Sequence, residues 1–238
     1  MMRSIQAHPF FADKSVMKVE PFPAQGYCNQ TFLVTTSRGQ FVWRKLLGKE
    51  VDREAEVYMM QLAHTSQITP ALHLYDQEQG IMLFDYVEGV HRQSLSFLHI
   101  RIVAEVLKKL HAIEYDRQKV PRTDIMKLID PSLPHVSQAL QELHSFVQQP
   151  ALCHNDLNPY NLIWKQCEVK LIDFEYAGMN DIYFDLASVS VEFGFSEEED
   201  VHLLQSYFGN MIFFKKKLDA YKTLYRVLCE TWFEKNGL

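Results

Sequence analysis

Two short polar segments, set between apolar runs, constrain the fold of this chain most. The first is His154–Asn161, with the sequence His-Asn-Asp-Leu-Asn-Pro-Tyr-Asn, and the second is Ile-Asp-Phe-Glu, whose aspartate is Asp173. The residues between them alternate in a way that predicts a β-hairpin with strands at 161–164 and 169–173. A fold for this chain must therefore hold both polar segments close together at one hairpin.

The polar residues of these segments have the spacing that kinases use for phosphoryl transfer. Asp156 is followed by Asn161, and Asp173 stands at the end of the next predicted strand. Asp156 can accept the proton of a substrate hydroxyl, while Asn161 and Asp173 offer hard oxygen ligands that suit Mg²⁺ on ATP. Asp, Asn and Pro also suit an ordinary turn. Because a turn does not require Asp173 with a Phe after it, the pattern favours an enzyme that uses ATP and Mg²⁺.

Composition excludes several other classes of protein. The net charge of -6 over 238 residues argues against nucleic acid as the main partner and would not repel a cationic substrate. The four cysteines form no Cys-x-x-Cys pair, which predicts free thiols and a cytoplasmic location. The N-terminus has no secretory signal pattern, and we find no apolar stretch long enough for a membrane span.

Hydrophobic periodicity divides the chain into a β-rich first part and a helical second part. We expect an α+β fold with two lobes, the N-terminal lobe at 1–87 and the C-terminal lobe at 88–238, and a ligand site between them. In the first lobe the patterns predict a hairpin (31–36 and 41–46, with a turn at 37–40), a helix at about 51–63, and extended segments at 72–75 and 81–86.

In the second part, apolar residues recur at helical spacing. Such runs cover 103–113, 136–147 and 218–232, and a further helix begins with a capping box at Ser196 and ends at Gly209. Asp185 precedes an apolar run, and we interpret it as the N-terminal cap of a helix.

Nucleotide binding is assigned to the first lobe and its junction with the second. Arg44 and Lys45 end a predicted strand, where a cation can reach the phosphates and pair with a carboxylate on the next helix. Because side chains alternate along a strand, only one of them points into the site, and we choose Arg44 with Glu56 as its partner. Gly26 and Asn29 would lie in a loop over the phosphates, and Asp85 and Val87 at the junction complete the predicted nucleotide site.

Substrate binding is assigned to one acid and to aromatic residues near the C-terminus. Glu192 is placed to face a substrate cation, and Tyr225 and Trp232 belong to an aromatic stripe on the last helix. Such stripes usually pack in the core, but one or two rings can also line a site that binds a cation through its π face.

These motifs resemble the choline/ethanolamine kinase and aminoglycoside phosphotransferase superfamily, which has a protein-kinase-like fold. The similarity is carried by the catalytic segment with Asn161, by Ile-Asp-Phe-Glu-Tyr-Ala-Gly at 172–178 and by Phe-Asp-Leu-Ala at 184–187. It implies transfer of the γ-phosphate of ATP to a primary alcohol, with Asp156 as base and Asn161 and Asp173 on the metal. By the same resemblance, Glu192 matches an acid that helps to hold the quaternary ammonium group of choline.

The acceptor is less constrained than the reaction. We predict choline or a similar amino alcohol as the small-molecule substrate, with thiamine or an aminoglycoside as alternatives. The C-terminal segment carries fewer tryptophans than choline kinases have there, which keeps these alternatives open. A pseudokinase that keeps the fold but not the turnover is a further alternative, supported only by the arginine at position 44.

Overall fold

A five-stranded antiparallel sheet forms the N-terminal part of the computed structural model, which describes residues 5–23, 29–47, 51–123, 127 and 129–236. The strand order is β1-β2-β3-β5-β4. The strands are β1 (Val16–Pro21), β2 (Asn29–Thr36), β3 (Gly39–Leu46), β4 (Leu72–Asp76) and β5 (Ile81–Asp85). The predicted hairpin and the two later extended segments are thus confirmed, and the β2–β3 pairing continues without a break to Thr36 and Gly39.

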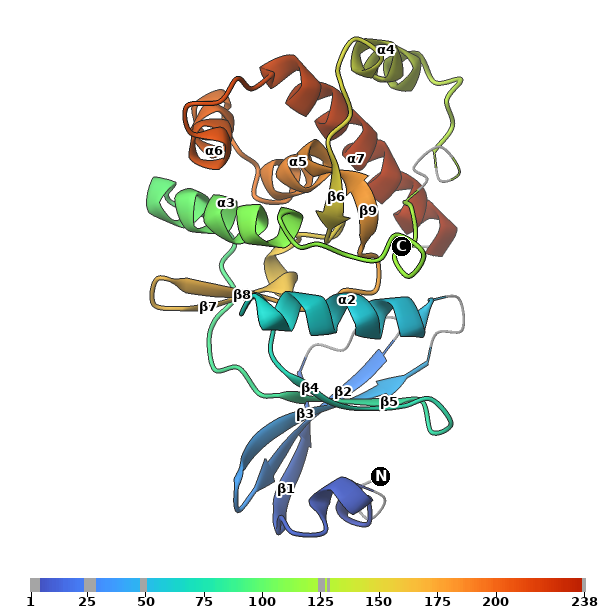
Figure 1. Cartoon of the computed structure of the whole chain (residues 1–238), viewed down its shortest axis with the longest axis vertical. Coiled ribbons are helices and arrows are strands. Elements are labelled where there is room, and N and C mark those ends of the chain that lie inside the picture. The colour runs from blue at the N-terminus through green and yellow to red at the C-terminus, as the bar shows by residue number, and fades with distance from the viewer. Residues whose placement is uncertain (1–4, 24–28, 48–50, 124–126, 128, 237–238) are drawn as a thin grey trace.

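Each face of the sheet is covered by a different segment (Figure 1). Helix α2 (Arg53–Thr65) covers one face, where its Met59 belongs to the same apolar core as Met82 and Phe84 of β5. The N-terminal segment, with the short 3-10 helix η1 (Pro9–Phe11), packs on the other face, where Phe11 contacts the rings of Phe41 and Trp43. The Asp52 side chain accepts a hydrogen bond from the Ala55 backbone N at 3.0 Å and so caps the start of α2.

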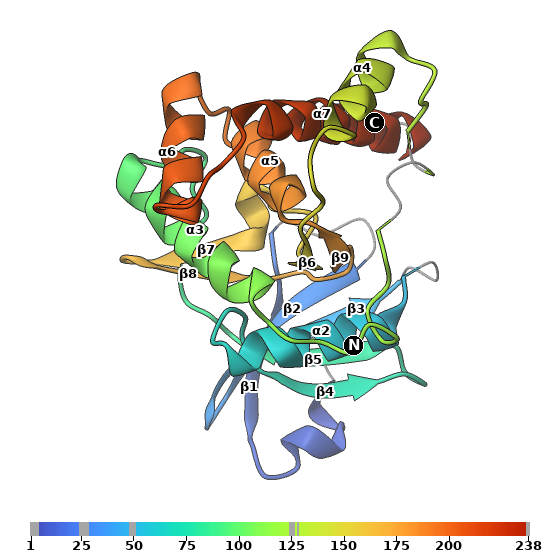
Figure 2. The same ribbon diagram turned by 45° about the horizontal axis from the view of Figure 1, so that its top comes forward.

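The C-terminal part contains five of the described α-helices and two small β-ribbons. Helix α5 packs against α7, and α4 also packs on α7 (Figure 2). The helices are α3 (Phe97–His111), α4 (Pro134–Leu143), α5 (Ile182–Glu192), α6 (Glu197–Phe208) and α7 (Lys215–Asn236). The ribbons pair β6 (Pro150–Cys153) with β9 (Gly178–Asp181) and β7 (Leu162–Lys165) with β8 (Glu168–Leu171), and the 3-10 helix η3 (Pro159–Asn161) precedes β7.

The connection between the two parts lies tightly against the β7–β8 ribbon. Val90 forms an isolated bridge with Trp164. A Cβ atom on Gly89 would lie 2.6 Å from the Trp164 carbonyl oxygen, so only glycine permits this approach. The predicted hairpin after the catalytic segment is confirmed and is held against the connection. The domain boundary at residue 87 stays a prediction.

The end predicted for the helix at 136–147 was wrong. The helix expected at 136–147 ends at Leu143, and the Val147 side chain is 86% exposed. His144 caps the helix, and the chain then turns toward β6, which Pro150 begins in an extended conformation. By contrast, the capping box at Ser196 and the helix end at Gly209, with φ 59°, are confirmed.

Asp185 does not cap α5, although the sequence suggested that it would. The cap is Asp181, whose side chain accepts from the Tyr183 backbone N at 3.0 Å. Asp185 lies one turn inside the helix and is fully buried. Among the described residues, no helix is long and apolar enough to cross a membrane.

Candidate active site

The segment between β6 and β7 holds the predicted catalytic aspartate in a network of side-chain amides. Asn161 Nδ2 donates to both the backbone oxygen and the Oδ2 atom of Asp156, each at 2.8 Å. Asn158 Nδ2 donates to Asp156 Oδ1 at 3.1 Å, while its own oxygen caps η3. Burial raises the pKa of Asp156, and these two amides and His154 oppose that rise. The carboxylate is thus fixed in place and retains free acceptor positions.

Asn155 adopts a left-handed backbone that three side-chain contacts stabilise. Its φ is 66°, which is uncommon outside glycine. Its Nδ2 donates to Thr123 Oγ1 and to the Tyr176 carbonyl, both at 2.9 Å, and its Oδ1 accepts from Asn180 Nδ2 at 2.9 Å. The turn that presents Asp156 is therefore determined by residues from three other segments.

Helix α5 holds the same segment in place, because its Asp185 accepts hydrogen bonds from the backbone of that segment. The sequence analysis did not predict this role. Asp185 Oδ2 accepts from His154 N and Oδ1 accepts from Asn155 N, each at 2.8 Å. His111 Nε2 lies 3.0 Å from Asp185 Oδ2, and Ser188 Oγ accepts from Leu157 N at 3.0 Å. The Phe-Asp-Leu-Ala match was the available signal, but a contact across 30 residues is not visible in a local pattern.

Asp173 is joined to the sheet through Arg44. Asp173 also has a left-handed backbone, with φ 66°. Arg44 Nη1 donates to Asp173 Oδ1 at 3.0 Å and to Glu56 Oε1 at 3.4 Å, and its guanidinium lies 5.2 Å from the Phe84 ring centre. Lys45 instead binds the carbonyl of Gln79. Of Arg44 and Lys45, only Arg44 is bound to Asp173.

Burial and neighbouring charges have opposite effects on the pKa values of Arg44 and Glu56. Burial disfavours the charged form of Arg44, but Asp173, Glu56 and Glu175 raise the pKa of its guanidinium. Burial raises the pKa of Glu56, although Arg44 and Arg53 oppose this. The Arg44 Nε atom is buried and has no hydrogen-bond partner among the described residues.

A second set of polar contacts, centred on Arg53 and Glu175, lies beside the contacts of Arg44 and was not predicted from the sequence. Arg53 Nη1 donates to Glu56 Oε2 at 2.5 Å and lies 3.5 Å from Glu175 Oε2. Asn29, buried at the start of β2, donates to Glu175 Oε2 and accepts from Arg53 Nη2, both at 3.4 Å. Burial, followed by the charge of Asp173, raises the pKa of Glu175 to about 7. Polar contacts thus join the sheet, α2 and the Asp173 segment.

Glu192 and Tyr225, which are predicted to bind the substrate, are in direct contact. Tyr225 OH donates to Glu192 Oε1 at 2.9 Å, and the Tyr225 side chain is only 2% exposed. Burial raises the pKa of Glu192, the Tyr225 bond opposes this, and the charge of Asp156 adds to it. Tyr225 is therefore both core and site, because its ring packs on Phe184 while its hydroxyl reaches the acid.

The remaining predicted residues are not brought into these contacts. Gly26 lies outside the described residues. Asp85 binds His73 Nε2 at 2.6 Å, and its neighbour Phe84, not Asp85, lies on the Arg44 face of the sheet. Val87 is half-buried in the connection, and Trp232 stacks edge-on with Phe233 near the end of α7.

Comparison with known proteins identifies the family. A model of the phosphotransferase enzyme family (APH) matches residues 18–214. The chain belongs to this family. It is 26% identical over 208 residues to human ethanolamine kinase 1, across 72% of this chain and 45% of that protein, so it spans about half the length of this relative.

Solved structures support the fold. Choline kinase LicA from Streptococcus pneumoniae superimposes with a TM-score of 0.79 at 24% identity, over 100% of this chain and 92% of that chain. Spectinomycin phosphotransferase in complex with ADP and spectinomycin superimposes with a TM-score of 0.75 at 12% identity, over 98% and 88% of the two chains. The predicted α+β, protein-kinase-like fold and the predicted superfamily are both confirmed.

Proposed function

We propose that this protein is an ATP-dependent kinase that transfers the γ-phosphate to the hydroxyl of choline or a similar amino alcohol. The observation that carries the proposal is the arrangement of Asp156 beside Asn161, at 2.8 Å, with Asp173 bound to Arg44, at 3.0 Å. Family membership and the likeness to structures of choline kinase LicA and of a phosphotransferase with ADP support it. We also infer a cytoplasmic location, because the proposed reaction consumes ATP.

In this reaction Asp156 accepts the proton of the acceptor hydroxyl. The hydroxyl oxygen forms a bond to the γ-phosphorus as the bond from that phosphorus to the β-γ bridging oxygen breaks, and ADP leaves. Arg44 is the cation placed to neutralise phosphate charge, and Asn158 and Asn161 keep the Asp156 carboxylate oriented.

The residues present also fit a magnesium site. Asn161 uses only its Nδ2 donors on Asp156, which leaves its Oδ1 as an oxygen ligand, and the Asp173 side chain remains 29% exposed with one oxygen on Arg44. Amide and carboxylate oxygens are the ligands that Mg²⁺ prefers. A bound Mg²⁺ would neutralise phosphate charge at these two residues.

A carboxylate without a cation supports an ammonium-bearing acceptor. Among the described residues, Glu192 has no lysine, arginine or histidine within ion-pair distance, and its Oε1 is held by Tyr225. An ammonium or trimethylammonium group would compensate the half-buried charge. The acceptor hydroxyl would then lie toward Asp156.

The alternatives have less support. An aminoglycoside carries several ammonium groups and would favour an acidic surface, but in the acidic run at 197–200 Glu199 completes the capping box of α6 and Asp200 is buried on Lys222. A pseudokinase reading rests on Arg44 alone, and Arg44 makes the contacts expected of the strand cation. Thiamine remains the main alternative acceptor.

An ADP-release assay with ATP and Mg²⁺ tests the proposal. Choline, ethanolamine, thiamine and an aminoglycoside are compared at equal concentrations. We expect ADP release that depends on choline or ethanolamine. Stimulation by thiamine or an aminoglycoside alone would replace the proposed acceptor, and no stimulation by any of the four would favour the pseudokinase.

A further inference from the structure

Four large apolar side chains are exposed together where the α6–α7 loop meets the segment between α4 and β6. On the loop, Met211, Ile212 and Phe214 are 65%, 81% and 47% exposed. On the other segment Val147 is 86% exposed. The ring of Phe214 contacts that of Phe146, the neighbour of Val147, with centres 5.1 Å apart, so the two segments form one surface. We call Val147, Met211, Ile212 and Phe214 the apolar patch.

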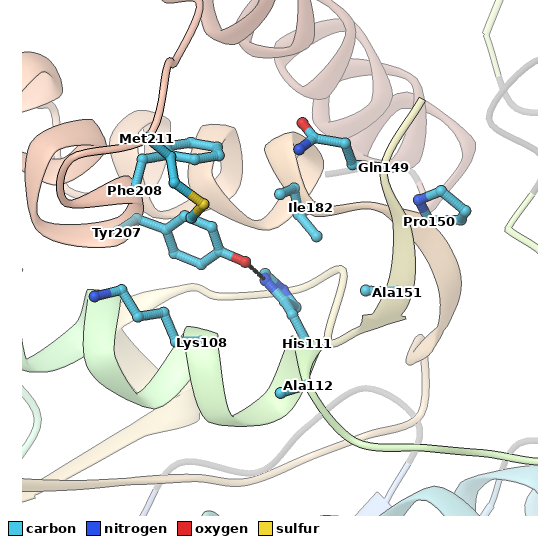
Figure 3. A pocket seen from close by; sticks show the side chains of 10 residues that line it. All are labelled: Lys108, His111, Ala112, Gln149, Pro150, Ala151, Ile182, Tyr207, Phe208 and Met211. Atoms are coloured by element: carbon cyan, nitrogen blue, oxygen red, sulfur yellow. Dashed lines mark hydrogen bonds between the residues drawn. The ribbon is translucent and has the colours of Figure 1, made fainter. Parts of the chain in front are cut away.

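The apolar surface continues from the patch into a pocket of about 470 Å³ (Figure 3). Met211 belongs to both, and Figure 3 shows its sulfur directed toward Tyr207. The polar groups of the pocket are few: Tyr207 OH is bound to His111 Nδ1 at 2.7 Å, and the side chains of Gln149 and Lys108 also line it.

The two segments that carry the patch are uncharged, and a run of lysines follows the second of them. Residues 143–155 and 201–214 contain no Asp, Glu, Lys or Arg, and three lysines follow at 215–217. Lys217 is buried on Asp181, and Lys215 pairs with Asp219. Lys216 is exposed and forms no ion pair with any described residue. In a chain of net charge -6, an uncharged apolar surface is thus followed directly by an available cation.

The area of the patch and the cation beside it favour a lipid surface over a second copy of the chain. Large side chains offer roughly 150–250 Å² each, so four of them at these exposed fractions present on the order of 500 Å². A stable protein interface needs about 800 Å² per partner. Self-association would also bring Lys216 near its own copy or leave it unpaired, whereas an anionic lipid surface supplies the opposite charge.

We propose that the apolar patch docks this protein on the surface of an anionic lipid bilayer. Met211, Ile212 and Phe214 enter the boundary between headgroups and acyl chains, and Lys216 contacts the anionic headgroups. In the described part of the chain, the side-chain hydrogen bonds of Asp156 involve Asn158 and Asn161 and no patch residue, and the proposal does not depend on the acceptor of the kinase reaction.

Co-sedimentation with sucrose-loaded vesicles tests the proposal, with phosphatidylcholine alone or with about a third phosphatidylserine. We expect the wild-type protein to sediment with the anionic vesicles and Ile212→Asp to lose roughly tenfold or more of its partition coefficient. Lys216→Gln should lose roughly fivefold, and 0.5 M salt should weaken binding of the wild type. Met17→Asp is the matched control, since Met17 is 61% exposed on β1 at the other end of the molecule (Figure 1).

Thermal unfolding of each variant verifies that it is folded, without reference to kinase activity. Unchanged sedimentation of Ile212→Asp, an equal loss in Met17→Asp, or no binding of the wild type to anionic vesicles would each overturn the proposal. So would a wild-type dimer in light scattering that Ile212→Asp converts to a monomer without any vesicle binding, because the patch would then be a self-association surface.

Discussion

Replacing Asp185 with Asn should uncouple the catalytic segment from α5. The carboxylate is fully buried and accepts the backbone N–H groups of His154 and Asn155, each at 2.8 Å, and the His111 ring N–H at 3.0 Å. An amide has one accepting oxygen. Whichever way it is oriented, its NH₂ group faces one buried backbone N–H, and that donor is left unsatisfied.

The expected cost follows from these bonds. A hydrogen bond to a charged group contributes about 1.5–3 kcal/mol, and an unsatisfied buried donor costs a further amount of about 1–3 kcal/mol, which gives an expected loss of about 2.5–6 kcal/mol in unfolding free energy. Movement of Asp156 by about 1 Å can cost on the order of 100-fold in rate. We therefore expect the turnover of the folded Asp185→Asn protein to fall on the order of 10- to 100-fold.

A second buried aspartate provides the control. Asp200 binds Lys222 at 2.6 Å and Ser190, away from the segment that carries Asp156. Asp200→Asn strips a buried ammonium of its partner and should destabilise the fold by about 3–5 kcal/mol. Urea unfolding and acceptor-dependent ADP release are measured for both variants below their unfolding transitions. The reasoning is refuted if the folded Asp185→Asn protein turns over at the wild-type rate, or if Asp200→Asn slows it equally.

Three further predictions concern the charged groups of the site. Arg44→Ala should raise the KM for ATP on the order of tenfold or more, whereas Lys45→Ala should leave it near the wild-type value in the same steady-state assay; equal effects would remove the distinction between the two cations. Glu192→Gln should raise the KM for the amino alcohol roughly 10- to 100-fold with little change for ATP, and a change confined to ATP would refute its assignment. Burial raises the pKa of Glu175 in the native state from 4.5 to about 7, so the unfolding free energy should fall as pH rises through this range. Glu175→Gln should flatten that part of the profile of unfolding free energy against pH. An unchanged slope would show that another group causes the pH dependence.

Much of the fold follows from local patterns in the sequence. The alternation around the turn at 37–40 predicts the β2–β3 hairpin. Alternation also shows that only one of Arg44 and Lys45 can lie on the α2 face, and the structure has Arg44 there. Ser196 with Glu199 marks the start of α6 because both halves of a capping box lie within four residues. Each of these signals is complete within a short stretch of chain.

The errors arise where long-range contacts decide. Asp185 and Asp181 are both acids near the start of an apolar run, and either could cap a helix. Asp181 does so because β9 leads directly into α5, while Asp185 is retained inside the helix by donors that come from the segment after β6. Similarly, nothing local shows that Glu175 meets Arg53 and Asn29, since these contacts span more than 100 residues.

Tyr225 shows a different difficulty. Its spacing on the last helix predicts a buried ring, while its place in an aromatic stripe also allows it to line a site that binds a cation. The structure satisfies both, because the ring packs on Phe184 and the hydroxyl binds Glu192. Periodicity reports which face of a helix is buried, but it does not report which polar atom at the edge of that face is used.

The central claim is that Asp156 supports phosphoryl transfer to an amino alcohol. ADP release and ³¹P NMR of the product, measured for wild type and Asp156→Asn with saturating ATP, Mg²⁺ and choline or ethanolamine, test it most directly. The account predicts one phosphomonoester for each ADP with the wild type, and a loss of about 10²–10⁴-fold in turnover for Asp156→Asn with unchanged thermal unfolding. An Asp156→Asn protein that turns over at the wild-type rate, or a wild-type protein that forms no phosphomonoester, would contradict it.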